Sequence, residues 1–388
     1  MTASLREPSW PDARRAAFDA VRPLPAVEVA LAQAWGATLA ADLQSRHPLP
    51  PFDTAMMDGW AVAGPPPWTV SGQLLAGSTA PPLEAGQAIG IATGAQVPAG
   101  ATAILRREWG LTSDVALRPD REVSVGQDIR RAGDEAAASD VLLPAGTAVR
   151  PPVVGLAALS GHDSLLVRPR PRVQALVLGD ELLDHGLSRD GRVRDALGPQ
   201  LLGWARACDA TGVDVRRVPD TLDATVAALR AATAEVVLTT GGTARGPVDH
   251  MHAALHAVDA KLVVDEVAVR PGHPMLLART PDGRFVVGLP GNPMSAAVAF
   301  LSLGAPVLAG LGGREFPLLD SARLSADVAA PATEHRLVPA TRFGGTVTPL
   351  PFQGSAMLRS VAVADCFAVA EPGGARAGDD VSVLPIPW

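Results

Sequence analysis

The stretch from Phe285 to Gly313 constrains the fold of this chain more than any other; it reads FVVGLPGNPMSAAVAFLSLGAPVLAGLGG. Its first three residues are apolar and mostly β-branched, which predicts a short buried strand, and the apolar segment after Pro293 predicts a long buried helix. The turn between them is rich in glycine and proline. Because a helix start offers free backbone amides and the positive end of the dipole, this turn could receive an anion. A tight turn without a ligand is the alternative.

Strand and helix patterns alternate from residue 172 onward, which predicts a doubly wound α/β domain. Strands are expected over residues 173–178, 213–218, 234–238, 262–269 and 275–278, and helices over about 197–211 and 220–232. Asp180 and Glu181 follow the first of these strands, at the position where open sheets bind ligands. The loop TTGGTARGPVDH follows residue 238. Its Gly241 and Gly242 could admit a phosphate and its Asp249 could hold a divalent cation, against a merely structural loop.

The two flanks of this region predict further domains. Ser9 is expected to cap a first helix, and Pro25 to precede a second helix that extends to Leu39. Short apolar segments between glycine and proline turns over residues 66–150 predict a small β-rich domain. Beyond about residue 315, short strands over 338–342, 346–350, 367–370 and 381–384 predict a β-barrel. Ser355 is expected at a helix start there, where an ordinary cap is the alternative.

Composition excludes several classes of protein. The formal net charge of −7 argues against nucleic acid as a main partner, because neutralising phosphates requires clustered cations. The two cysteines, Cys208 and Cys366, lie far apart and suggest neither a zinc site nor a disulfide framework. We find no signal-peptide core near Met1 and no apolar run long enough to span a bilayer, and therefore expect a cytoplasmic protein without membrane contact. A length of 388 residues predicts two to four domains.

An ordered set of short motifs gives a more specific indication. In chain order they read PFDTAMMDGWAV, TGAQVPAGA, DIRRAGDE, LGDEL, TTGGTARGPVDH, RPGHP and GLPGNPMSA. This set resembles the molybdopterin molybdenumtransferase family, which is related to the C-terminal domain of gephyrin. The resemblance extends from Pro25 to the C-terminus, and the order of the motifs makes coincidence a poor explanation.

The resemblance implies a fold and an activity. The fold is multidomain α/β plus β: a doubly wound molybdopterin-binding domain (171–313), an inserted β-rich domain (44–138), a helical N-terminal and linker region (1–43 with 139–170) and a C-terminal β-barrel (314–388). The activity is insertion of molybdate into adenylylated molybdopterin with Mg²⁺ and release of AMP, a late step of molybdenum cofactor biosynthesis. The implied partners are these two substrates, a second copy of the chain as a homodimer, and a transient contact with a molybdopterin adenylyltransferase.

The resemblance also assigns site residues, position by position. The catalytic positions are Asp58, Asp180, Asp195 and Asp249, of which Asp180 and Asp249 are the expected metal ligands. The substrate-binding positions are Thr93, Glu135, Glu181, Gly241, Gly242, Pro290, Gly291 and Asn292. The molybdate-binding positions are Arg270, His273, Arg336 and Ser355. Cationic donors suit this last task because molybdate is a dianion.

The chain departs from the family pattern at several of these positions. Arg270 and His273 stand where the family has two lysines, Glu135 follows Asp134 where the family has Gly-Glu-Asp, and Ala196-Leu197 replaces a polar pair. Lys261 is the only lysine of the chain, so arginine for lysine can reflect a coding bias. His273 is a larger change, because a histidine is charged only part of the time near neutral pH.

Two alternatives remain open on the sequence. The segment TTGG also resembles molybdopterin adenylyltransferases, although their similarity is confined to residues 171–313. The substitutions also permit a divergent paralogue that binds molybdopterin without turnover, since one fold can host several functions. Release of AMP would distinguish these from the molybdenum-inserting enzyme.

Overall fold

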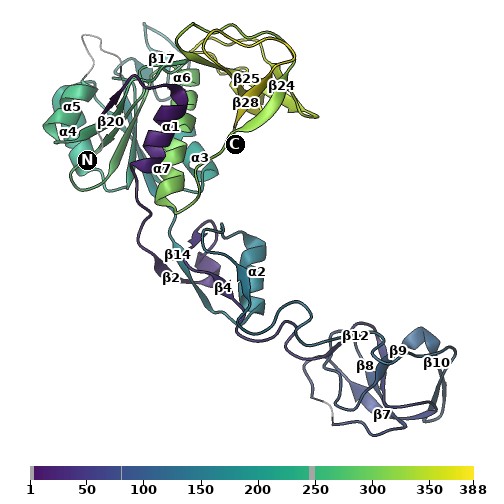
Figure 1. Ribbon diagram of the computed structural model, residues 1–388. Coiled ribbons are helices and arrows are strands. Elements are labelled where there is room, and N and C mark those ends of the chain that lie inside the picture. The colour runs from purple at the N-terminus through teal and green to yellow at the C-terminus, as the bar shows by residue number, and fades with distance from the viewer. Residues whose placement is uncertain (1–3, 80, 244–249) are drawn as a thin grey trace. The chain divides into compact units, whose positions relative to one another are not determined.

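The computed structural model describes residues 4–79, 81–243 and 250–388. The chain forms two compact units, and Figure 1 shows the helices and strands of each. The first unit comprises Met1–Val27, Gly36–Ala40 and Leu166–Trp388. The second comprises Glu28–Trp35 and Ala41–Leu165. Each unit has hydrophobic cores of its own and is described separately.

A seven-stranded mixed sheet forms the centre of the first unit. Its order is β1 (Leu5–Arg6), β20 (Lys261–Asp265), β22 (Leu276–Arg279), β23 (Phe285–Leu289), β19 (Val236–Thr240), β15 (Arg172–Leu178) and β18 (Thr211–Val218). Strands β18, β15, β19 and β23 are parallel, whereas β22 is antiparallel to both neighbours. The predicted α/β sheet is confirmed, and its parallel strands end together where the candidate site residues begin.

Helices cover both faces of this sheet. On one face lie α1 (Trp10–Asp19), α3 (Gly198–Ala207) and a long helix formed by α6 (Pro293–Ala299), the π-helical η3 (Phe300–Gly304) and α7 (Ala305–Leu311). On the other lie α4 (Leu222–Ala231) and α5 (Met251–Ala257). Alternate residues of β15 serve the two cores: Val173 and Val177 join the first, Leu176 and Leu178 the second. This division follows from the two-residue period of a strand.

The long helix corrects one expectation from the sequence. At 19 residues, Pro293–Leu311 is long and apolar enough to cross a membrane, although no such run was expected. An 18-residue window of this helix is nevertheless 94% buried inside the protein. A helix that is apolar on every side can be buried in a protein core as well as in a membrane. This one is buried between the sheet, α1 and α3.

The C-terminal part of the first unit is a closed barrel. Its sheet order is β21 (Val269–Arg270), β25 (His335–Phe343), β26 (Thr346–Pro349), β24 (Asp320–Leu324), β28 (Asp380–Pro385) and β27 (Cys366–Ala370), and an additional β25–β27 pairing closes it. Four of these strands were predicted from the sequence, and β24 was not. Strand β21 joins from the α/β part, so that Arg270 pairs in register with Arg336.

The second unit is rich in short strands, as predicted. Its main sheet has the order β10 (Gly110–Ser113), β11 (Ala116–Pro119), β7 (Trp68–Leu74), β8 (Gln87–Ile91), β6 (Gly59–Val62) and β9 (Ala103–Arg106). Two further pairs are β5 (Thr54–Ala55) with β12 (Ile129–Arg130), and β4 (Leu43–Gln44) with β13 (Val141–Leu143). Its helical segments include α2 (Pro151–Leu159) and the 3-10 turn η2 (Arg107–Trp109).

Two predicted helices are absent from the described residues. The expected helix after Pro25 is instead the strand β2 (Val27–Ala30), the 3-10 turn η1 (Leu31–Gln33) and the strand β3 (Thr38–Leu39). The run Val-Glu-Val alternates apolar and polar residues, which is the strand period, and Gly36 at φ +80° interrupts any helix. Ser355 lies in a turn, and the short helix that follows, η4 (Val361–Val363), begins later.

Candidate active site

Two cavities of the first unit meet at the turn after β23. The strand-end cavity, ≈ 630 Å³, lies at the carboxyl ends of the parallel strands and is lined by Glu181, Asp195, Gly241, Gly291 and Asn292 among others. The basic cavity, ≈ 350 Å³, is lined by Arg270, His273, Pro290, Asn292, Arg336, Gln353 and Ser355 among others. Asn292 lines both cavities, so the turn that opened the sequence analysis joins them.

Glycines let two loops approach closely in the strand-end cavity. Gly241 and Gly242 adopt φ values of +76° and +66°, a region that side chains disfavour. The Gly241 N–H donates to the carbonyl oxygen of Leu289 at 2.9 Å, which ties the loop after β19 to the end of β23. A Cβ atom on Gly291 would lie 3.8 Å from the Gly241 Cα. The two loops therefore present adjacent backbone to whatever occupies the cavity.

A residue of the C-terminal barrel region, Ser355, caps the start of the long helix. Asn292 is the residue before α6, and its side chain makes no capping hydrogen bond. The carbonyl oxygen of Ser355 instead accepts from the backbone N–H groups of Met294 and Ser295, at 2.9 and 3.2 Å. Asn292 Nδ2 donates to the Ser355 hydroxyl oxygen at 3.2 Å. Ser355 thus reaches the turn without beginning a helix, and its hydroxyl lines the basic cavity.

Carboxylates gather where β15 and β18 end. An Asp180 oxygen accepts from the backbone N–H of Asp220 at 3.3 Å. Burial, followed by the negative charges of Asp180 and Glu181, raises the pKa of Asp220 above its usual range, while His250 opposes this. The three carboxylates therefore repel one another, and a hard divalent cation would relieve that repulsion. Asp249, the second expected metal ligand, lies outside the described residues.

Asp195 has a structural task in this site. One of its carboxylate oxygens accepts from the backbone N–H groups of Leu197 and Gly198, at 2.9 and 3.0 Å. These amides belong to the first turn of α3, where no intrahelical acceptor is available. Leu197, which replaces a polar residue of the family pattern, is 5% exposed and joins the core.

Two adjacent arginines define the basic cavity. Arg270 on β21 and Arg336 on β25 are register partners in a parallel pair. The Arg270 Nε donates to Glu334 at 2.8 Å, whereas Arg336 donates to the Ala329 carbonyl oxygen at 3.0 Å and to Gln353 at 3.2 Å. Glu334 offsets the charge of Arg270, whereas Arg336 is bonded to neutral oxygens and keeps its positive charge for an anion. The arrangement therefore favours binding of an oxyanion.

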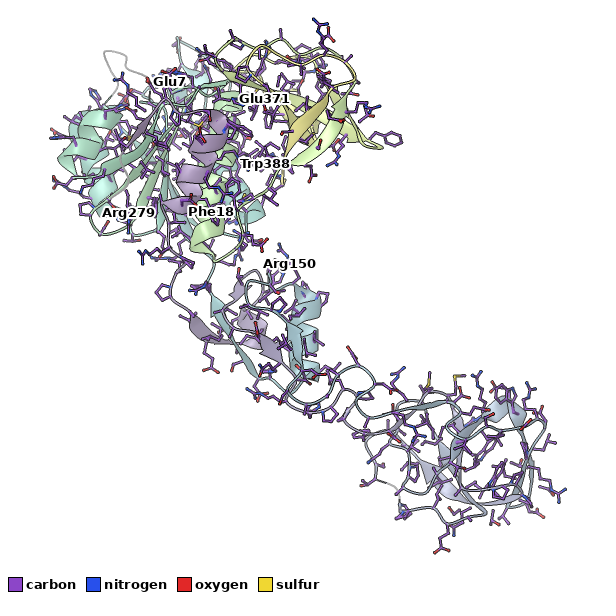
Figure 2. All side chains as sticks on the ribbon, in the orientation of Figure 1. Glu7, Phe18, Arg150, Arg279, Glu371 and Trp388 are labelled. Carbon is purple, nitrogen blue, oxygen red and sulfur yellow. The ribbon has the colours of Figure 1, made fainter. Side chains whose placement is uncertain are left out.

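His273 completes this cavity and is paired with a residue from the N-terminus. Its Nε2 lies 3.0 Å from a carboxylate oxygen of Glu7, a residue labelled in Figure 2. One ligand atom each from Glu7, His273 and Glu334 lies within 4.8 Å of the others. Glu334 already forms an ion pair with Arg270, so the carboxylates of this cluster offset the positive charge of the arginine.

The second unit holds the remaining predicted site residues. One carboxylate oxygen of Asp58 accepts from the backbone N–H and the hydroxyl of Thr93, at 2.7 and 2.8 Å. These hydrogen bonds, the backbone one foremost, lower the pKa of Asp58. Glu135 lines a different cavity of ≈ 390 Å³, with Met56, Arg130 and Asp134. Within this unit the structure thus brings Asp58 and Thr93 together and places Glu135 elsewhere.

Several residues near the site were missed in the sequence. Asp220 follows the end of β18 in the same way as Asp180 follows β15, so the sequence carries a signal for it beyond the start of the helix expected over 220–232. Glu334 lies two residues from Arg336, so its proximity could have been noted. Glu7 gave no signal, because 266 positions separate it from His273.

Three family models match successive parts of the chain. The model described as "MoeA N-terminal region (domain I and II)" matches residues 9–161. "Probable molybdopterin binding domain" matches residues 174–310, and "MoeA C-terminal region (domain IV)" matches residues 321–386.

Full-length relatives agree with these matches. A molybdopterin molybdenumtransferase of Staphylococcus aureus is 30% identical over 387 residues, which covers 93% of this chain and 91% of the relative. One from Staphylococcus epidermidis is 27% identical over 381 residues, covering 92% and 90%. The crystal structure of a molybdopterin biosynthesis moeA protein from Pyrococcus horikoshii matches with a TM-score of 0.79 at 22% identity, covering 98% of this chain and all of that one, and so supports the fold. The chain belongs to the molybdopterin molybdenumtransferase family, also called the MoeA family.

Proposed function

We propose that this chain is a molybdopterin molybdenumtransferase that inserts molybdate into adenylylated molybdopterin and releases AMP. The observation that carries the proposal is the pairing of Arg270 with Arg336 in a cavity that shares Asn292 with the strand-end cavity. A dianion held in the basic cavity would lie next to a substrate held in the other. Positioning two anionic reactants side by side supplies much of the catalysis that such a transfer needs.

The proposed roles follow from the donors in each cavity. Gly241, Gly242 and the turn Pro290–Asn292 hold the phosphate region of the pterin through backbone groups. Arg270, Arg336 and His273 grip molybdate, and the Ser355 hydroxyl provides a further contact. Asp58, Asp180, Asp195 and Asp249 act in catalysis, with Thr93, Glu135 and Glu181 binding substrate. Asp195 does so while also capping α3.

Mg²⁺ is the proposed metal. Asp180 offers carboxylate oxygens beside Glu181 and accepts a hydrogen bond from the backbone N–H of Asp220, whose pKa is raised by burial first and then by the charges of Asp180 and Glu181. Hard oxygen donors of this kind suit Mg²⁺, and Asp249 would be the second ligand. When bound, the ion would offset negative charge on the phosphate that leaves with AMP.

We further propose the assembly and setting of the enzyme. The chain acts as a homodimer, divides into the four domains expected from the sequence, and receives its substrate through a transient contact with a molybdopterin adenylyltransferase. Its location is cytoplasmic, in keeping with its two free thiols, Cys208 and Cys366.

The test is release of AMP. Purified protein with adenylylated molybdopterin and Mg²⁺ should release AMP only when molybdate is added. Arg336→Gln should raise the KM for molybdate by about tenfold or more, because a charge-assisted hydrogen bond contributes roughly 1.5–3 kcal/mol. Arg323→Gln removes an exposed arginine from the same barrel and is the matched control.

Two results would contradict the proposal. No AMP release at saturating molybdate would exclude the molybdenum-inserting reaction. ATP-dependent adenylylation of molybdopterin by the same preparation would assign the chain to the preceding step instead.

A further inference from the structure

Glu7, whose carboxylate meets His273 of the basic cavity, belongs to an N-terminal segment that the family motifs do not include. Strand β1 adds to the edge of the sheet beside β20. The Glu7 N–H donates to the Asp265 carbonyl oxygen at 2.9 Å, and the Ala268 N–H donates to the Pro8 carbonyl oxygen at 3.0 Å. The backbone on both sides of the Glu7 side chain is therefore fixed to the strand region that leads to Arg270.

The backbone of Glu7 is unusual as well as fixed. Its φ is +47°, which is uncommon for a residue other than glycine, asparagine or aspartate and costs free energy. Such a conformation persists only where surrounding contacts enforce it. Here it directs the side chain to His273, whose Nε2 lies 3.0 Å from the carboxylate.

The hydrogen bond to Glu7 uses the donor that an anion would need. A carboxylate has only acceptors to offer, so the Nε2 of His273 must donate its proton to Glu7. An oxyanion in the same cavity also has only acceptors. The carboxylate of Glu7 and a molybdate oxygen are therefore alternatives for this N–H, and their negative charges repel one another.

The two acidic residues bonded to cationic side chains of the basic cavity differ in exposure. The side chain of Glu334 is 11% exposed and is bonded to Arg270, whereas that of Glu7 is 52% exposed. Arg336 is bonded to neutral oxygens. Binding a dianion thus requires one rearrangement above all, which is the departure of Glu7 from His273.

We propose that Glu7 competes with the oxyanion for His273 and so sets the affinity of the basic cavity for molybdate. The inference rests on the proposed function, because it takes the basic cavity to be the molybdate site. It adds to that function an internal carboxylate that must be displaced by the substrate.

The experiment measures binding separately from turnover. Isothermal titration of the full chain with sodium molybdate gives the Kd for wild type, Glu7→Gln, Glu7→Asp and Glu315→Gln. Glu7→Gln keeps the shape and removes the charge, so its Kd should fall by about three- to tenfold at low salt, with a smaller gain at high salt. Glu7→Asp keeps the charge and should bind less tightly than Glu7→Gln. Glu315→Gln removes an exposed charge away from the cavity and should resemble wild type.

The other outcomes overturn the inference. An unchanged Kd in Glu7→Gln would show that Glu7 does not oppose the anion, and a higher Kd would show that it instead orients His273 for binding. Absence of molybdate binding in every variant would also refute it. AMP release is scored independently: tighter binding in Glu7→Gln without AMP release would leave the competition standing and refute the proposed function.

Discussion

The Asp58 side chain accepts two hydrogen bonds from Thr93, which donates both its backbone N–H and its hydroxyl to one carboxylate oxygen. These two hydrogen bonds favour the ionised form and lower the pKa of Asp58, with a smaller contribution from the charge of Arg107. Since the folded-state pKa lies below the unfolded one, the stabilisation is present above the unfolded pKa. It is lost as the pH falls through the folded pKa.

Thr93→Val should therefore raise the pKa of Asp58 towards its ordinary value while leaving the backbone donor in place. The stabilisation would then be smaller, and its loss on acidification would be complete at a higher pH than in wild type. Carbon-13 NMR titration of the Asp58 carboxyl measures the change, with Thr93→Ser, which retains the hydroxyl, as control. An Asp58 pKa equal in wild type and Thr93→Val would contradict the role assigned to the hydroxyl.

At the scale of elements, Asp195 joins the start of α3 to the strand-end cavity. Asp195→Ala removes the acceptor for two backbone amides and should lower the free energy of unfolding by about 0.5–2 kcal/mol. Asp195→Asn keeps an acceptor and should melt close to wild type, yet release AMP more slowly because it lacks the charge. Thermal unfolding and AMP release, measured on both variants, separate the two roles. Full activity in a stable Asp195→Asn would reduce Asp195 to a helix cap.

The elements that could be predicted are those whose pattern is local. The strand, turn and helix around Gly288 follow from apolar periodicity and turn residues, and β15, β19 and α4 were predicted within two residues of their observed bounds. Two elements were predicted too long. Asp209 and Glu266 adopt φ values of +55° and +62° and mark the ends of the helical and extended segments before them. Positive φ at residues other than glycine leaves little trace in composition.

The candidate site was less accessible to prediction than the fold. The pairing of Arg270 with Arg336 requires the barrel to dock on the α/β part, and the contact of Glu7 with His273 requires β1 to add to the sheet edge. Both depend on tertiary arrangements between distant segments. The sequence motifs predict which residue types the site contains. The fold is needed to show which charged side chains contact one another.

At the scale of the whole molecule, the hydrophobic cores separate along with the two units. The two main cores of the first unit use only its own residues, as do two cores of the second. Both cavities of the candidate site belong to the first unit, while Asp58, Thr93 and Glu135 belong to the second. Substrate binding, which needs the two cavities, can therefore be measured separately from turnover, which is proposed to need both units.

The connection between the units offers a way to do so. Strand β3 pairs antiparallel with β14 (Ser164–Arg168), and the Ala40 N–H donates to the Leu166 carbonyl oxygen at 2.9 Å. An Asn-Gly linker can join two such strands as a tight hairpin, so residues 41–165 can be replaced by these two residues. The shortened chain keeps its main cores and both cavities.

We expect this shortened protein to fold, to bind molybdate with a Kd close to that of the full chain, and to release no AMP. Near-native binding is expected because Arg270, His273 and Arg336 are all retained, and turnover should fail because Asp58 and its neighbours are gone. Circular dichroism establishes folding, titration calorimetry gives the Kd, and the AMP assay gives turnover. Arg336→Gln in the shortened chain should weaken binding as it does in the full chain, which confirms that the same cavity is measured. AMP release by the shortened protein would show that the reaction does not require the second unit, and would contradict the catalytic role proposed for Asp58.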